Sequence, residues 1–207
     1  AAGVAGKGET GRRDTVREAF LLCACLLFLW PGTGAAERPG FDRLLQEGGL
    51  RYSAPAGFEE RLPGYSPFGY EKRLVSEALP LEVRYSIRPL NRIEVDYEDP
   101  HNAAPHPNDL FDMLFRSVIE VLSDGPDSVS RAYPPETAAA RFNAGWAAVA
   151  VMDIKPEVSR YYTQGLLLAM HRNDRADAYV LVLTNDLAAH KSDIDTIHRS
   201  LGFIERP

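Results

Sequence analysis

Apolar and polar residues alternate most regularly between positions 81 and 88. The apolar positions are Leu81, Val83, Tyr85 and Ile87, and the polar positions are Glu82, Arg84, Ser86 and Arg88. Successive side chains of a strand point to opposite faces, so this pattern predicts a strand with one face in the core and a charged face in solvent. On that interpretation Arg84→Ala costs under about 1 kcal/mol, as expected for an exposed ion pair.

The alternation resumes at residues 93–98, which predicts a hairpin with 81–88. In that register Arg84 faces Glu98 and Arg88 faces Glu94 on the outer surface, while Tyr85 faces Tyr97 in the core. Each such cross-strand pair contributes roughly 0.2–1 kcal/mol. The register also accounts for the acidic positions of 94–98 without a calcium site.

Further strands are predicted on both sides of this hairpin. Short ones lie within 50–58 and 70–75, and a longer alternating one covers 140–154. Residues 166–171 and 178–183 form another hairpin around the polar loop 173–177.

Helices are predicted at three places. Residues 41–47 end at two glycines, residues 110–122 form an apolar stripe behind the capping residue Asn108, and a last helix begins at Ser192 and ends at Gly202. Strands and helices follow one another without βαβ alternation. The predicted fold class is therefore α+β, an antiparallel β-sheet flanked by helices.

An uninterrupted apolar run occupies residues 19–30. It is too short to span a bilayer comfortably, follows Arg17, and precedes small residues at 34–36, which is the pattern of a cleavable signal peptide. We therefore expect an N-terminal extension plus signal peptide at 1–36, cleavage before Glu37, and a single α+β domain at 37–207. The predicted location is the bacterial periplasm or the secreted fraction, with membrane contact only through the signal segment before cleavage.

Composition narrows the chemistry. The 207 residues carry a formal charge of −6, which disfavours binding to nucleic acid. Both cysteines, Cys23 and Cys25, lie in the apolar run, so the domain at 37–207 has no thiol for a disulfide or a thiolate metal site. No glycine-rich phosphate loop is present, and we expect no cofactor. The oligomeric state stays open.

Two histidines and two carboxylates lie close together in the proline-rich segment 99–109. These are Asp99, His101, His106 and Asp109, and imidazole with carboxylate suits zinc, nickel or copper. The alternative is a solvated linker whose acidic residues lie near the positive N-terminus of the following helix.

Aromatic residues gather before the first long strand. Tyr65, Phe68 and Tyr70, together with Trp146, are candidates for lining a cleft that holds a small apolar ligand or a peptide of a partner protein. The alternative is that they anchor the core and its loops.

Two short motifs carry a resemblance to a known family. Tyr52 to Phe58 has the form Tyr-x-x-Pro-x-Gly-Phe, and Ser200-Leu201-Gly202-Phe203 closes the last helix. With the order of elements between them, they resemble the PsbP-like superfamily. The resemblance implies an α/β/α sandwich and mostly non-enzymatic binding or assembly roles, and it offers no catalytic residues to carry over.

The sequence therefore favours an exported envelope protein with a non-catalytic binding or assembly role, its partner being an envelope protein or a small apolar ligand. The alternative is a hydrolytic or metal-dependent envelope enzyme that uses His101 and His106. Metal analysis of the purified protein separates the two.

Overall fold

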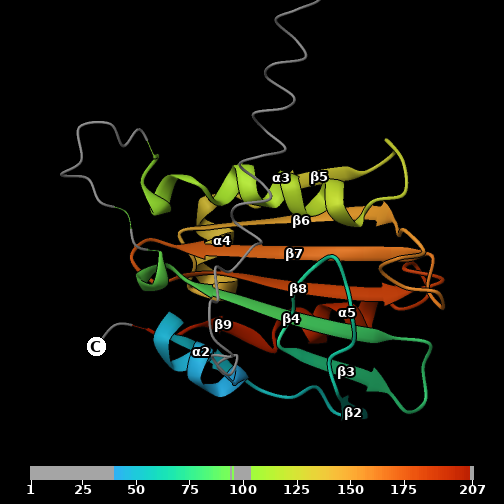
Figure 1. The fold of residues 1–207 in the computed structure, drawn as a ribbon. Coiled ribbons are helices and arrows are strands. Elements are labelled where there is room, and N and C mark those ends of the chain that lie inside the picture. Colours follow the sequence, from blue (N-terminus) through green and yellow to red (C-terminus); the bar gives the residue numbers. More distant parts are fainter. Residues whose placement is uncertain (1–39, 94, 96–103, 206–207) are drawn as a thin grey trace, which may run out of the picture. The chain divides into compact units, whose positions relative to one another are not determined.

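The polypeptide folds around a seven-stranded antiparallel sheet (Figure 1). The computed structural model describes residues 40–93, 95 and 104–205, all of which fall in one unit, Arg38–Pro207. The strand order is β2-β3-β4-β8-β7-β6-β5, and every neighbouring pair is antiparallel. The strands are β2 (Phe58–Arg61), β3 (Lys72–Ser76), β4 (Glu82–Pro89), β5 (Val129–Ala132), β6 (Trp146–Asp153), β7 (Gln164–Arg172) and β8 (Ala176–Thr184).

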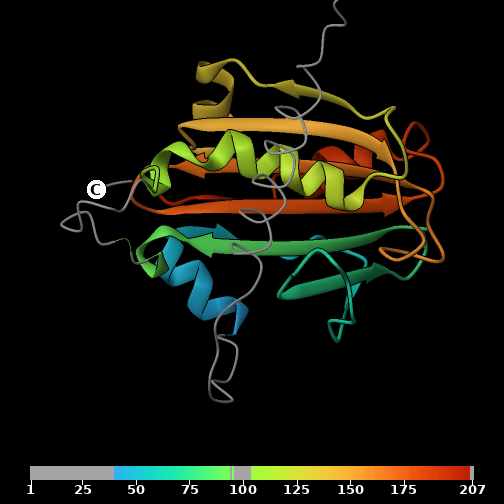
Figure 2. The same cartoon turned by 45° about the horizontal axis from the view of Figure 1, so that its top comes forward.

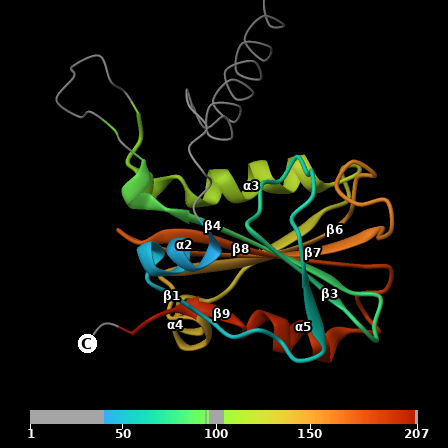
Figure 3. The same cartoon turned by 60° about the horizontal axis from the view of Figure 1, so that its bottom comes forward.

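Helices cover both faces of this sheet. Helix α3 (Phe111–Leu122) lies on one side, here called the α3 face (Figure 2). The opposite side, the α5 face, is covered by α2 (Phe41–Gly48), α4 (Pro135–Phe142) and α5 (Lys191–His198) and by a small sheet of β1 (Leu50–Tyr52) and β9 (Leu201–Phe203) (Figure 3). The predicted α+β class, an antiparallel sheet in an α/β/α sandwich, is confirmed.

Each face has its own apolar core. On the α5 face, Val83, Tyr85 and Ile87 of β4 pack with buried residues of α2, α4 and α5. On the α3 face, Phe115, Val118 and Leu122 of α3 pack over Leu167 of β7 and Leu181 of β8. Since β8 is buried at all nine positions, the sheet needs cover on both sides, which a strand of almost continuous apolar sequence predicts.

Local signals explain most of the element boundaries. Helix α2 ends because Gly49 adopts φ 62°, a left-handed conformation that glycine accepts without a steric penalty. The predicted β7–β8 hairpin is confirmed with a shorter loop, Asn173 to Arg175, in which Asp174 has φ 59°. Among the described residues no helix is long and apolar enough to cross a membrane.

The predicted hairpin between 81–88 and 94–98 is wrong. Strand β4 is hydrogen-bonded to β3 on one edge and to β8 on the other, so neither edge is free. Arg84 faces Arg73 and Leu181, and Arg88 faces Asp177, where Glu98 and Glu94 were expected. After Pro89 the chain enters a 3₁₀ turn, η1 (Leu90–Arg92), and residues 94 and 96–103 lie outside the described part. The alternation identified the strand but not its partner.

The charged face of β4 is not in solvent either. Glu82 is 2% exposed, Arg84 5% and Ser86 0%. The strand is central, and the segments on the α3 face cover Glu82, Arg84 and Ser86, whereas the Arg88 side chain is 33% exposed. The prediction that Arg84→Ala has only a small effect on folding stability therefore no longer holds.

Other predicted boundaries also change. Helix α3 begins at Phe111 behind a second 3₁₀ turn, η2 (Pro107–Asp109), and Asn108 does not cap it. Instead the Asn108 amide donates to Asp174 Oδ1 at 2.9 Å and accepts from the Asp174 N–H at 2.9 Å. Strand β5 and helix α4 were not predicted. Leu201 and Gly202, expected at the end of the last helix, form β9 with Phe203.

Candidate functional site

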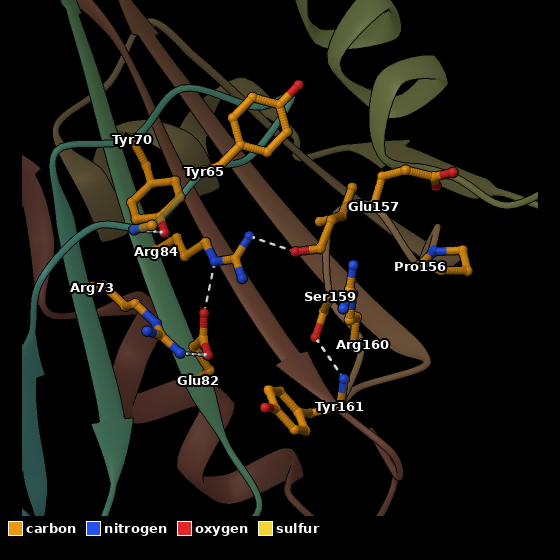
Figure 4. A pocket seen from close by; sticks show the side chains of 12 residues that line it. Tyr65, Tyr70, Arg73, Glu82, Arg84, Pro156, Glu157, Ser159, Arg160 and Tyr161 are labelled. Atoms are coloured by element: carbon orange, nitrogen blue, oxygen red, sulfur yellow. Dashed lines mark hydrogen bonds and ion pairs between the residues drawn. The ribbon is translucent and has the colours of Figure 1, made fainter.

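Two loops on the α3 face enclose a depression of about 520 Å³ above β4 (Figure 4). One loop joins β2 to β3 and contributes Tyr65 and Tyr70. The other joins β6 to β7 and contributes residues 156–161. The floor consists of Arg73 of β3 with Glu82 and Arg84 of β4.

The first loop is held by its own side chains. Phe68 is 1% exposed, and its ring lies 6.2 Å from the ring of Tyr179 in the sheet, centroid to centroid. The Tyr70 hydroxyl accepts a hydrogen bond from the Gly64 N–H at 2.8 Å, and Ser66 Oγ accepts one from the Phe68 N–H at 3.2 Å. The loop is thus fixed in front of β4 although it has no regular secondary structure.

The second loop is fixed in a similar way. Val158 is 3% exposed and inserts into the core of the α3 face. Lys155 Nζ donates to the carbonyl of Glu120 at 2.6 Å, at the end of α3. Ser159 Oγ accepts from the backbone N–H groups of Tyr161 and Tyr162 at 3.2 and 3.1 Å. Both walls of the depression are therefore ordered.

The floor is an ion cluster of two arginines and one glutamate. Arg84 Nε donates to Glu82 Oε1 at 2.7 Å, and Arg73 Nη2 donates to Glu82 Oε2 at 2.8 Å. The positions follow from the sheet: Glu82 and Arg84 are two residues apart on one face of β4, and Arg73 is the partner of Arg84 on β3. Two like charges face each other across the strands, and Glu82 bridges them.

Arg84 also joins the sheet to both loops. Its Nη1 donates to the Val158 carbonyl at 2.9 Å and approaches Ser66 Oγ at 3.4 Å. The guanidinium carbon lies 4.9 Å from the centre of the Tyr70 ring, a cation–π contact. Figure 4 shows the guanidinium between Tyr70 and the second loop, facing the depression. The side chain is therefore a structural element of the site as well as its main charge.

Arg73 is the more accessible of the two cations. Its side chain is 28% exposed, against 7% for Arg84. Its hydrogen bond with Glu82 raises the pKa of Arg73, so the group stays charged. Among the described residues its buried Nε has no hydrogen-bond partner. The floor thus retains donor capacity.

Exposed aromatic side chains stand on the rim. Tyr65 is 91% exposed and Tyr161 80%, one on each loop, and Leu62 beside them is 89% exposed. Single exposed hydrophobic side chains are ordinary on a protein surface, but several that surround a depression mark a contact surface.

A second depression, of about 560 Å³, lies at the other end of the α3 face, where Phe111, Trp146 and His171 meet. The Phe111 ring stacks on His171 at 4.4 Å and contacts Trp146 at 4.9 Å. His171 Nδ1 is 2.7 Å from Asp177 Oδ1 and Nε2 is 2.8 Å from Asn173 Oδ1. Burial raises the pKa of Asp177, while its hydrogen bond to His171 opposes this. Both ring nitrogens already have partners, so neither nitrogen of His171 is free to activate a nucleophile.

The four aromatic residues predicted to share a cleft do not share one. Tyr65 and Tyr70 line the first depression, Trp146 lines the second, and Phe68 is buried in the core between sheet and loop. The anchoring alternative thus applies to Phe68. Their role in binding stays a prediction.

The structure describes two of the four predicted metal ligands. Asp99 and His101 lie outside the described residues. His106 and Asp109 are exposed, and His106 Nδ1 accepts a hydrogen bond from the Asn108 N–H at 3.1 Å. No group of three or more His, Cys, Asp or Glu that could hold a metal occurs within the described part of the chain. The metal site remains a prediction.

Sequence reasoning missed the charged floor. Glu82 and Arg84 were noticed but assigned to solvent, and Arg73 was not singled out. The alternating pattern of β4 is the same whether its polar face meets water or other side chains. The tyrosine-, proline- and glycine-rich loop 61–70 was the one available sign that something covers β4.

Comparison with solved structures shows a distant likeness to a known fold. The solution structure of cyanobacterial PsbP (CyanoP) from Synechocystis sp. PCC 6803 is similar to this chain at a TM-score of 0.41 and 13% sequence identity, covering 85% of this chain and 98% of that one. No protein-family model matches the chain, and no curated protein sequence does.

Proposed function

We propose that this is an exported envelope protein with a non-catalytic binding role, and that its binding site is the depression above β4. The observation that carries the proposal is an ion cluster at the floor of a depression between two loops, in which the Arg73 side chain is 28% exposed, with Tyr65 and Tyr161 exposed on the rim. A buried ion cluster costs desolvation and gives little net stability, so its presence below an opening favours a role in recognition.

The chemistry of the depression supports binding over catalysis. Its carboxylate at the floor, Glu82, is held by two arginines. Among its hydroxyls, Ser159 and Tyr70 accept backbone hydrogen bonds that shape the two loops. A hydrolytic site needs a nucleophile next to an oriented base, and these groups have other partners.

Export is supported by the sequence alone. The apolar run 19–30 and the small residues at 34–36 precede the domain, and both cysteines belong to that run. Sequencing of the N-terminus of the protein from cell envelopes should find Glu37 or a residue within a few positions of it. Recovery of an intact 19–30 segment would contradict export by cleavage.

Site-specific photocrosslinking tests the binding role. A photoreactive amino acid at Tyr161 or Tyr65 should give a saturable cross-link in cell envelopes. The same substitution at Val129, which is 72% exposed on the edge strand β5, serves as the matched control and should not. Equal cross-linking from all three positions, or from none, would reject the depression as the binding site.

A further inference from the structure

The floor of the depression has more positive than negative charge. Arg73 and Arg84 share the single carboxylate of Glu82. On the wall, exposed Arg160 and Glu157 add one charge of each sign. One guanidinium charge is therefore uncompensated at a place where water is partly excluded. An anion there would relieve the repulsion between Arg73 and Arg84, which face each other across the strands.

The donors at the floor suit an oxyanion. A guanidinium presents its N–H groups in a planar fork that matches two oxygens of a carboxylate or phosphate. Arg73 donates to Glu82 through Nη2, its unpartnered Nε is itself buried, and within the described residues the rest of the guanidinium makes no hydrogen bond. Because its side chain is 28% exposed, an incoming anion meets Arg73 before the more deeply buried Arg84.

The rim suits a planar ring. Tyr65 and Tyr161 stand on opposite loops, and Figure 4 shows the Tyr65 ring beyond Tyr70 at one end of the site and the Tyr161 ring on the side of Glu82 at the other end. Aromatic rings attract other rings in offset or edge-to-face contacts. A group that is anionic at one end and aromatic at the other would use the floor and the rim together.

We infer that the depression binds an aromatic oxyanion, a carboxylate or phosphate attached to a planar ring, with the anion on Arg73 and Arg84 and the ring against a tyrosine of the rim. This rests on the proposed binding role and names its ligand class. The anion has two sources, a carboxylate such as a peptide C-terminus or a phosphate ester, and the probes below distinguish them.

Titration of the ¹⁵N-labelled protein followed by NMR tests the inference. The probes are N-acetyl-L-phenylalanine, its neutral amide N-acetyl-L-phenylalaninamide, phenyl phosphate and inorganic phosphate. We expect the aromatic anions to shift amide signals of residues 64–70 and 156–161. The neutral amide should bind at least about tenfold more weakly, the size of one charge-assisted hydrogen bond. The tighter of the two aromatic anions identifies carboxylate or phosphate as the natural source.

Variants locate the anion. Arg73→Gln should lower the affinity for the aromatic anions at least about tenfold. Arg73→Lys should keep only part of the wild-type affinity, because lysine retains the charge and lacks the planar fork of donors. Arg160 lies on an exposed loop, so Arg160→Ala should weaken binding without affecting folding. Arg131→Ala, on the exposed edge strand β5, is the matched control and should change nothing.

Three results would overturn the inference: equal binding of acid and amide, equal binding of inorganic phosphate and phenyl phosphate, or no shift with any probe. If Tyr161 still cross-links to a partner in that case, the binding role stands and only the ligand class is wrong. If neither experiment succeeds, both fail.

Discussion

The two faces of β4 are equally buried but are built from opposite materials. On the α5 face, Tyr85 and Ile87 are fully enclosed by apolar side chains. On the α3 face, Glu82 and Arg84 are buried as deeply, and they meet Arg73, a backbone carbonyl and a tyrosine ring. One face obtains its stability from close packing, whereas the other must satisfy every charge that it removes from water.

This difference separates folding from binding. The apolar side chains of β4 are buried, so substitutions there should act on stability. The polar face lies under two loops that leave it open between them, and a buried ion cluster is seldom the most stable way to fill such a space. Substitutions on the two sides of a single strand should therefore have different costs and different consequences for binding.

The largest loss of stability is expected on the apolar face, from Tyr85→Ala. The Tyr85 ring is fully buried, contacts Tyr52 at 5.3 Å and Phe41 at 6.0 Å, and leaves a cavity when truncated. Removal of a buried aromatic side chain costs about 3–5 kcal/mol. Urea unfolding measures it, with Arg131→Ala on the exposed β5 as control. A loss below about 1 kcal/mol would contradict the burial of this face.

Arg84→Ala should cost about 3 kcal/mol, since removal of one partner of a buried pair leaves the other charge uncompensated. We expect a value at the low end for such pairs because Glu82 retains Arg73. Urea unfolding measures this cost, and the variant should also no longer bind the aromatic anions. A cost under about 1 kcal/mol would restore the interpretation that this face is exposed to water.

The apolar side also contains an unpaired titratable group, His198 at the end of α5. Burial, with a smaller effect from Arg141, lowers the pKa of His198 to about 4, and Asp195 opposes the shift. Within the described residues its Nε2 has no hydrogen-bond partner. Because its pKa in the folded protein lies below the unfolded value, the unfolded chain takes up the proton first as the pH falls. The stability that neutral His198 allows is therefore present above about pH 6.5 and is lost toward pH 4.

Between pH 7 and about pH 4.5 this loss amounts to roughly 2.5 kcal/mol. His198→Leu should remove it, so the difference between wild type and variant should grow across this window. Asp177, whose pKa is raised by burial, contributes with the opposite sign in both proteins and cancels in the comparison. Parallel stability–pH curves for the two proteins would show that the pKa of His198 is the same in the folded and unfolded states.

The sequence predicted the elements that depend on local signals. The alternation at 81–88, the apolar strands of the β7–β8 hairpin and the glycines behind α2 each fix a conformation through nearby residues. It did not predict the neighbours of β4, since residue parity selects a face and says nothing about the partner strand. The exposed strand β5 has no apolar alternation from which it could be predicted. Arg73 lies next to Glu82 and Arg84 only because of the register between β3 and β4. The candidate site is a product of tertiary structure, and only its tyrosine-rich loop was visible beforehand.

Two buried serines give the smallest and most direct test of the comparison. Ser200 supports the apolar face: its Oγ lies 2.9 Å from the Tyr85 hydroxyl, with which it forms a hydrogen bond. Ser86 belongs to the polar face of β4 and is 0% exposed, and among the described residues its Oγ has no partner. The two side chains are equal in size, so the cavities left by alanine are similar and the difference reports hydrogen bonding.

Ser200→Ala should cost about 1 kcal/mol or slightly more, because it also leaves the buried Tyr85 hydroxyl unsatisfied. Ser86→Ala should lie within about 0.5 kcal/mol of wild type or be stabilising, since it removes a hydroxyl that lost water without gaining a partner. Tyr85→Phe/Ser200→Ala completes a double-mutant cycle that isolates the hydrogen bond. If Ser86→Ala proved the more costly of the two serine variants, the Ser86 hydroxyl would have to make a hydrogen bond on the polar face. The polar groups of that face would then have fewer unmet hydrogen bonds than the proposed anion site requires.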